Sequence, residues 1–425
     1  MSKRLLRASR FLAMVWNISL QNTEDSMAAK TCRAYITLLL VSLLISALAG
    51  CGGTSVKSID AAFAKPMSKL ELVRLLAGRS QEKVVSFAHK NLAGLELRNF
   101  NFQGTVFTQA YLARTDFRNA RFLRARFDKA DLTGAIMAEV DLRQVNFRGA
   151  NLTGVDFTGA NLNGADLSGA NLQGAVFNRS LLQGIKLEGA VLYDAQFVNV
   201  YLGATDLSGL DLREVNFQGS DLSNSILRKA NLEGVDLSGV NLRAADLGSA
   251  NLMRAKLDSA ILSEALLTSA YFVDASLENC DLRGANLFHA RMQEANMQKA
   301  LLRGANLSEA NLTGVDLRKA NLFNVTAVNA NFSWTDMRET VLTRGDFTGT
   351  NFSDAKLNEA ILLKSVLVRA RLVATSLQGA NLRGVDFKGA DVSGANFRDA
   401  DLLDAKNLSR VRGLDKARYL DKAVL

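Results

Sequence analysis

Few side chains in this sequence have the types and spacing that catalysis requires. His89 and His289 are the two histidines, and a long run of repeats separates them, so we expect each at the surface. The aspartates recur at one position of that repeat and alternate there with asparagine, which cannot replace a catalytic acid. Nucleotide-binding, serine-hydrolase and zinc-protease motifs are absent. We therefore predict a non-enzymatic protein without catalytic residues, cofactors or metal ligands.

The three cysteines, Cys32, Cys51 and Cys280, are too few for a disulfide framework or a zinc site. Cys280 replaces a small inward-pointing residue of the repeat, so we predict a buried, inert thiol there. Cys51 is the one cysteine with predicted chemistry. The four residues Leu-Ala-Gly-Cys that end at Cys51 resemble a bacterial lipobox, in which the cysteine is acylated and becomes the first residue of the mature protein.

The segment before Cys51 has the order of a secretory signal peptide. Lys30 and Arg33 precede the uncharged, mostly apolar run AYITLLLVSLLISALAG. We predict residues 1–50 as the signal region, with Met27 as an alternative start, and residues 51–65 as the lipidated N-terminus and a flexible tether. An uncleaved anchor helix is the alternative.

Both interpretations of this segment place the rest of the chain outside the cytoplasm, because the basic residues before the apolar run stay inside. By resemblance to lipoproteins, Gly52 in place of aspartate favours the outer membrane of a Gram-negative host. We therefore predict a protein of the bacterial cell envelope that a lipid anchors to the membrane, facing the periplasm.

A five-residue repeat dominates the chain. Every fifth residue from Leu92 to Leu402 is apolar, nearly always Leu, Phe or Met, and the residue two positions earlier is usually Ala. Asn or Asp often stands between them, as in ANLTGVDFTGANLNGADLSGANLQG. A period of five fits neither an α-helix nor a flat strand. The pattern resembles the pentapeptide-repeat family, with its motif A(D/N)LXX.

This resemblance implies an all-β fold, a right-handed quadrilateral β-helix of four pentapeptides per coil, over residues 91–405. About 16 coils fit this range. The sequence supports a 20-residue coil independently, because large side chains recur at that spacing: Phe117, Met137, Phe157, Phe177, Phe197 and Phe217.

Short helical caps are predicted at both ends of the solenoid. Pro66 opens an amphipathic pattern that runs to Arg79, and Val84–Ala88 form a second short pattern, so residues 66–90 are predicted as a helical N-terminal cap. The period ends after Ala405, and the basic residues 406–425 are predicted as a helical C-terminal cap. The family resemblance implies a possible homodimer through that end.

The net charge of +9 belongs to the termini and not to the repeat. Residues 91–405 contain 32 Lys and Arg against 35 Asp and Glu. One local excess stands out near the start, which we name the basic collar. We hypothesise that it contacts anionic lipid or lipopolysaccharide head groups, with a merely solvated ring of charge as the alternative. Its members are Arg114, Arg118, Arg121, Arg124, Arg126 and Lys129.

A second outward feature is a column of apolar residues where Asn or Asp is usual. Its members differ by multiples of 20, so they share one side of the coil, and we name that side the partner face. Asp221, Asn241, Asp281 and Asn321 interrupt the column, so tolerated drift is the alternative to a contact surface. The apolar members are Leu181, Tyr201, Ile261, Leu301, Val341 and Ile361.

The leading functional hypothesis is a lipid-anchored rod that binds or scaffolds an unknown protein of the envelope. Two alternatives stay open, both suggested by the family: a cytoplasmic mimic of DNA that binds a topoisomerase, and a helper in the assembly of envelope lipid or cell-surface material. The mimic requires a strongly acidic surface, whereas this repeat is nearly neutral. We expect no nucleic acid partner.

Overall fold

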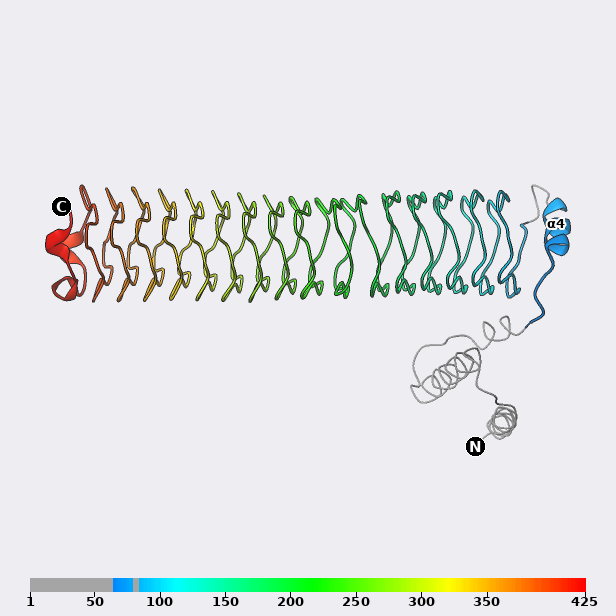
Figure 1. Cartoon of the computed structure of the whole chain (residues 1–425), viewed down its shortest axis with the longest axis horizontal. Helices are drawn as coiled ribbons and strands as arrows, with labels where there is room; N and C mark the ends of the chain where they lie inside the picture. Colours follow the sequence, from blue (N-terminus) through cyan, green and yellow to red (C-terminus); the bar gives the residue numbers. More distant parts are fainter. Residues whose placement is uncertain (1–63, 79–83) are drawn as a thin grey trace, which may run out of the picture. The chain divides into compact units, whose positions relative to one another are not determined.

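The computed structural model describes residues 64–78 and 84–425. Within them one α-helix, α4 (Lys69–Ala77), is followed by a long solenoid. Three 3-10 turns end the chain: η1 (Leu408–Arg410), η2 (Leu414–Lys416) and η3 (Leu420–Lys422). Figure 1 shows the coils of the solenoid stacked one on the next along its length.

The coil repeats every 20 residues, as predicted. Parallel β-bridges join nearly every outward Asn/Asp-type position to the residue 20 further on, beginning with Ser86 and Val106. Each coil has four short sides, and backbone hydrogen bonds such as that from Leu132 N–H to the carbonyl of Asn151 (2.8 Å) connect it to the next. The fold class is therefore the predicted right-handed quadrilateral β-helix.

The corners of the coil explain the polar residues of the motif. At the corner after Leu132, the N–H of Thr133 donates to Oδ1 of Asp131 at 3.0 Å. Gly134 then takes a positive φ of 63°, and Ala135 N–H closes the turn on the carbonyl of Leu132 at 2.8 Å. The side chain before the central residue thus fixes the corner, which both Asp and Asn can do.

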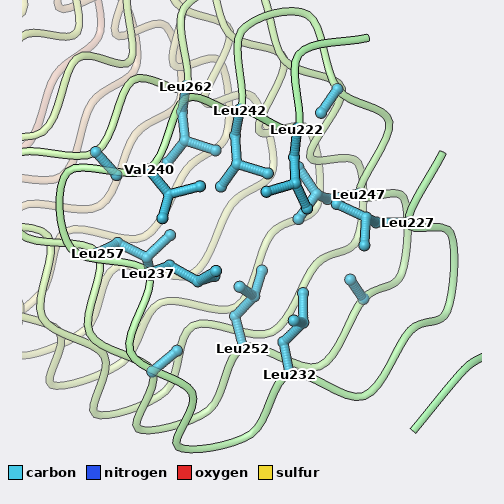
Figure 2. Packing of buried hydrophobic residues seen from close by; sticks show 14 of the residues in the cluster. Leu222, Leu227, Leu232, Leu237, Val240, Leu242, Leu247, Leu252, Leu257 and Leu262 are labelled. Carbon is cyan, nitrogen blue, oxygen red and sulfur yellow. The ribbon is translucent and has the colours of Figure 1, made fainter. Parts of the chain in front are cut away.

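The core is a set of stacked columns that fill the inside of the coil. The central residue of each unit is fully buried, and the small residue two positions earlier is buried from residue 105 to residue 400. Figure 2 shows Leu222, Leu242 and Leu262 side by side in one row, each from a successive coil. Identical side chains therefore interlock from coil to coil, and each buried Leu stabilises the stack by about 1.5–3 kcal/mol.

The predicted column of large residues is present. The rings of Phe157 and Phe177 stack with centroids 5.1 Å apart, and Phe177 and Phe197 stack at 4.6 Å. Near the N-terminal end the aromatic packing spreads to other sides of the coil, where Phe107 and Phe127 stack at 4.7 Å.

The N-terminal cap is shorter than predicted. Of the described residues in the predicted cap, 66–78 and 84–90, only those of α4 are helical, and the second predicted helix at Val84–Ala88 is wrong. Ser86 already pairs with Val106 and Phe87 is fully buried, so the solenoid begins five residues before the predicted start at residue 91. The physical reason is the period itself, because Phe87 stands five residues before Leu92 and fills the same inward position.

Helix α4 is joined to the first coil by polar and apolar contacts. Ser68 forms a capping box with Glu71, in which the Ser68 N–H donates to the carboxylate at 2.8 Å and Glu71 N–H donates to the Ser68 hydroxyl at 3.2 Å. Met67 N–H donates to the carbonyl of Asn91 at 2.8 Å, and Leu72 is fully buried in the core. The helix thus covers the first end of the stack.

The C-terminal cap is not the predicted helix over 406–425 but a final, widened coil. Arg412, Arg418 and Val424 still pair with the coil before them, yet they are six residues apart instead of five. The extra residue on each side is taken up by a 3-10 turn, η1, η2 or η3. Packed against the core at the new spacing of six are Leu408, Leu414, Leu420, Val411, Ala417 and Ala423.

The ladder between coils opens mainly at one place, which we call the seam; one coil further on, the N–H of Phe217 also lacks a backbone partner in the next coil. The N–H groups of Leu182, Leu187 and Leu192, on three consecutive sides of one coil, have no backbone partner in the next coil. The fourth side is closed, because Phe197 N–H donates to the carbonyl of Asn216 at 2.8 Å. Figure 1 shows the wider spacing in the green part of the solenoid.

Two bulky residues account for the seam. Ile185 and Leu210 are the only residues larger than Val at the small inward position between residues 105 and 400. Ile185 faces Thr205 of the next coil, and Leu210 faces Ala190 of the coil before it. Side chains too large for a position that usually holds Ala force the surrounding backbone apart.

We expect amide hydrogens at the seam to exchange quickly. Leu182, Leu187 and Leu192 should exchange at least roughly 100-fold faster than the same positions one coil earlier, because a lost hydrogen bond removes local protection. The reference amides are those of Leu162, Leu167 and Leu172, which donate to the next coil at 2.8 Å each. Hydrogen exchange read by mass spectrometry or NMR measures the difference.

The double variant Ile185→Ala/Leu210→Ala tests the cause of the seam. It removes the bulk that separates the coils, so we expect the seam amides to become more protected while the reference amides do not change. Equal protection of both sets in the unmodified protein would show that the seam is closed in solution.

Candidate partner-binding surfaces

The predicted lipidation site lies outside the described residues. Cys51, the signal region 1–50 and all but the last two residues of the segment 51–65 belong to the part of the chain that the structure does not describe. In residues 64–78 and 84–425, no helix has both the length and the apolar character needed to cross a membrane.

The partner face is one continuous ladder. Leu181 bridges Tyr201, and Val341 bridges Ile361, so these apolar residues are direct neighbours across coils. Leu181 and Tyr201 are 55% and 52% exposed, while Ile261, Leu301 and Ile361 are 40–41% exposed and Val341 is half-buried. The structure therefore brings all six predicted residues onto one side of the coil.

Polar residues divide the partner face into shorter apolar stretches. Asn241 donates its side-chain amide to Asp221 at 3.0 Å, and Asp281 accepts from Arg283 of its own unit at 2.7 Å. These residues interrupt the column between Tyr201 and Leu301. The apolar residues are consequently densest at two places, around Leu181 and from Leu301 to Ile361.

An aromatic and cationic group borders the second of these stretches. The ring of Phe323 lies between two guanidinium groups, with Arg303 at 5.2 Å and Arg344 at 6.0 Å from its centroid. All three side chains belong to the corner that follows the partner face. The sequence contains a signal for this group, because these positions also differ by about 20.

The basic collar spreads around one coil, and two of its six cations are paired with the aspartates that lie among them. Arg118 pairs with Asp116 at 2.8 Å, and Arg126 pairs with Asp128 at 3.2 Å. Arg124 donates to the side-chain oxygen of Gln144 at 2.9 Å. Of the collar residues, all within the described part of the chain, Arg114, Arg121, Arg124 and Lys129 make no salt bridge.

Asp116 forms more ion pairs than Asp128, the other carboxylate that lies among the collar residues. It also accepts from Arg98 at 2.7 Å, and its side chain is 10% exposed. The hydrogen bond from the Arg118 side chain, with further bonds from the Arg118 N–H and from Arg98, holds the pKa of Asp116 well below its usual range. The carboxylate is therefore charged over the whole physiological range.

Two side chains of types that often serve in catalysis, those of His289 and Cys280, form structural contacts. His289 lies 2.7 Å from Glu309 and edge-on to Phe288. Cys280 is fully buried, its thiol donates to the carbonyl of Ala260 at 3.2 Å, and burial raises its pKa strongly. No group of three His, Cys, Asp or Glu side chains in the described residues is placed to hold a metal ion.

One cavity lies beside the N-terminal cap. It has a volume of about 650 Å³ and is formed by Val73, Leu76 and Ala77 of α4 and by residues 98–101 of the solenoid. Its walls are mostly apolar, and the only charged side chain in the lining is Arg98, which already pairs with Asp116.

These features define a repeat solenoid whose chemistry lies in its outer faces. The family comparison agrees with this class: the model described as pentapeptide repeats matches the chain in eight copies between residues 101 and 402. The protein belongs to the pentapeptide repeat family. No curated protein sequence matches the chain.

Solved structures of the same family are similar to the solenoid. HetL, a pentapeptide repeat protein involved in heterocyst differentiation regulation in the cyanobacterium Nostoc sp. strain PCC 7120, is 28% identical over 61% of this chain and 91% of its own, with a TM-score of 0.25. QnrB1, a plasmid-mediated fluoroquinolone resistance protein, is 17% identical over 50% of this chain and 88% of its own, with a TM-score of 0.21.

The ion pairs of Asp116 predict a dependence of stability on pH. Asp116→Asn keeps an oxygen for the Arg118 N–H and removes the charge. Because the folded state lowers the pKa of Asp116, its stabilising effect is complete above about pH 4 and is lost as the pH falls. We expect the variant to be less stable by about 1 kcal/mol at pH 7, and this difference to shrink towards pH 2.

Denaturant unfolding of both proteins at pH 7 and pH 2.5 measures this effect. Asp156→Asn is the matched control, because Asp156 accepts the Thr158 N–H at 2.9 Å but forms no salt bridge in the part of the chain that the structure describes. A loss of the same size for both variants, or one that does not depend on pH, contradicts the predicted role of the ion pairs.

Proposed function

We propose that the protein is a non-enzymatic, lipid-anchored rod of the bacterial cell envelope that binds a protein partner through its partner face. The observation that supports this proposal best is the row of β-bridged positions that exposes Leu181, Tyr201, Ile261, Leu301 and Ile361 on one side of the solenoid. Exposed apolar residues gathered on one surface mark contact sites, and a straight ladder offers a partner a flat, regular one.

A binding role is consistent with the side chains of the described solenoid. Cys280 is inert because burial keeps it protonated, and the aspartates are occupied in turns and ion pairs. The mimicry of DNA requires a surface of dense negative charge, whereas 32 basic and 35 acidic residues are interspersed between residues 91 and 405. We therefore favour a scaffold over an enzyme or a mimic of DNA.

The lipid anchor is tested by the intact mass of the mature protein. After membrane fractionation we expect loss of residues 1–50 and two or three acyl chains on Cys51, and an unprocessed chain for Cys51→Ser. Outer-membrane and inner-membrane fractions should separate the two possible locations. A soluble, unprocessed chain in place of the lipidated one would remove the envelope from the proposal and return cytoplasmic partners to consideration.

The partner face is tested by placing charge within it. In cells we expect Val341→Asp/Ile361→Asp to reduce chemical cross-linking of the lipoprotein to its partner at least tenfold, because burying an unpaired carboxylate is costly. Asn321→Asp is the control, since that position of the ladder is already polar. If cross-linking and the oligomeric state, including any dimer through the C-terminal end, are both unchanged, the partner face is excluded as the binding surface.

We propose that the protein makes a second contact, in which the basic collar binds anionic head groups near the anchor. The supporting observation is that Arg114, Arg121, Arg124 and Lys129 make no salt bridge within the described residues. Replacing all six collar residues by Gln in the unlipidated Cys51→Ser chain should weaken binding to phosphatidylglycerol vesicles or lipopolysaccharide at least tenfold. Equal binding by both chains would show that the collar is only solvated.

A further inference from the structure

The partner face changes character between Leu301 and Asn381. Over these five coils neither the face nor the corner that follows it contains a carboxylate, and Asp281 and Asp401 stand just beyond each end. The corner carries four cations and two large apolar side chains, which we name the basic strip. Its members are Arg303, Phe323, Arg344, Leu363, Lys364 and Arg383.

The apolar ladder explains why Arg303 of the basic strip is unpaired. In other units an aspartate stands two residues before the arginine and binds it, as Asp141 binds Arg143 and Asp281 binds Arg283, both at 2.7 Å. Leu301 takes the place of that aspartate before Arg303. Across the described residues Arg303, Arg344 and Lys364 form no salt bridge, while Arg383 reaches Asp401 in the next coil at 2.8 Å.

The exposed cations are held in a defined arrangement. Phe323 is flanked by the guanidinium groups of Arg303 and Arg344, so two of the cations form cation–π contacts with one aromatic ring. Such contacts restrict a long side chain while leaving its N–H groups available to a carboxylate. A carboxylate that binds there meets a site that is already organised.

The dimensions of the strip match a helix lying along the stack. Successive coils are about 4.8 Å apart, so five coils span roughly 19 Å. An α-helix rises about 5.4 Å per turn, and about 13 residues cover the same length. Carboxylates on successive turns would then face Arg344 and Lys364, and apolar residues beside them would face Val341 and Ile361.

The opposite edge of the partner face limits the width of the partner. Glu339 and Glu359 stand exposed at the corner that precedes Val341 and Ile361. Lys319 of the preceding coil pairs with Glu339 at 3.6 Å, whereas Glu359 forms no salt bridge within the described residues. The charge of Glu359 repels a broad polyanion such as a membrane surface or a nucleic acid duplex, which would cover both corners. A single helix covers the ladder and the basic strip without reaching these glutamates.

We infer that the basic strip and the adjoining partner face bind an acidic, amphipathic helix of a protein partner, with its carboxylates on the cations and its apolar side chains on the ladder. This inference rests on the proposed binding role of the partner face and adds the chemistry of what is bound.

The test uses the full-length, detergent-solubilised protein and a fluorescent 18-residue helical peptide of Glu, Leu and Ala, with Glu and Leu on one face. Fluorescence anisotropy should show binding at least tenfold tighter than for a scrambled peptide of the same composition, and weaker binding at high salt. The affinity of the variant Arg344→Glu/Lys364→Glu for the Glu-containing peptide should be at least tenfold lower. A peptide with Lys in place of Glu should recover affinity for that variant.

Lys186→Glu/Lys229→Glu is the matched control, because it makes the same change of charge at two lysines that form no salt bridge with any described residue and lie on other sides of the solenoid. Circular dichroism and thermal unfolding confirm that each variant is folded. Equal peptide binding by all three proteins overturns the inference. Tighter binding of phosphatidylglycerol vesicles or of a 20-base-pair duplex, with the same dependence on Arg344 and Lys364, overturns it in favour of a polyanion.

The cellular cross-link separates this inference from the proposed function. If Val341→Asp/Ile361→Asp abolishes the cross-link while Arg344→Glu/Lys364→Glu leaves it intact, the partner face stands and the acidic helix is wrong. If neither variant changes the cross-link, both proposals fail. Loss of the cross-link with both variants, together with the expected binding of the Glu-containing peptide, supports both proposals.

Discussion

The distance between adjacent coils is the constraint on which the rest of this structure depends. Backbone hydrogen bonds set it at about 4.8 Å, and every buried side chain has to match a neighbour at that distance. Leu stacks on Leu and Phe on Phe because identical shapes repeat well at a fixed interval, and Ala at the small position lets the backbone of one side approach the next. The outer surface inherits the same interval, so any property repeated every 20 residues becomes a straight line along the solenoid.

The corner chemistry connects this scaffold to the charge pattern. A carboxylate or amide before the central residue accepts the N–H at the corner, as Asp131 accepts that of Thr133. Where the side chain is Asp, it also neutralises an arginine two residues later, as Asp336 does for Arg338 at 2.7 Å. An apolar residue at the same position leaves both the corner and the cation without that partner. One substitution therefore alters hydrophobicity and charge together, and surface chemistry can change from coil to coil while the core stays uniform.

Much of the solenoid follows from the sequence because its geometry is periodic. The spacing of five predicts the inward residues, the spacing of 20 predicts the phenylalanine column, and the same counting places Leu181 to Ile361 on one side. The prediction fails where the period alone is insufficient. Phe87 continues the repeat without the rest of the motif, and Leu408, Leu414 and Leu420 keep a regular spacing of six that a search for five overlooks.

Contacts between side chains are a further limit on prediction from the sequence. The charges of Arg118 and Arg126 are reduced by Asp116 and Asp128, and the flanking of Phe323 by two arginines depends on rotamers as well as positions. Cys51 stays a prediction, since it lies outside the described residues.

The seam gives the solenoid a mechanical property that a uniform stack lacks. A regular β-helix resists bending equally at every coil, because each coil is bonded to the next on all four sides. Where the N–H groups of Leu182, Leu187 and Leu192 have no partner in the next coil and that of Phe197 is still bonded, the bonded side acts as a hinge and the other three sides are held less tightly. Two stiff segments then meet at a point of low bending stiffness, and a force across the rod flexes it there.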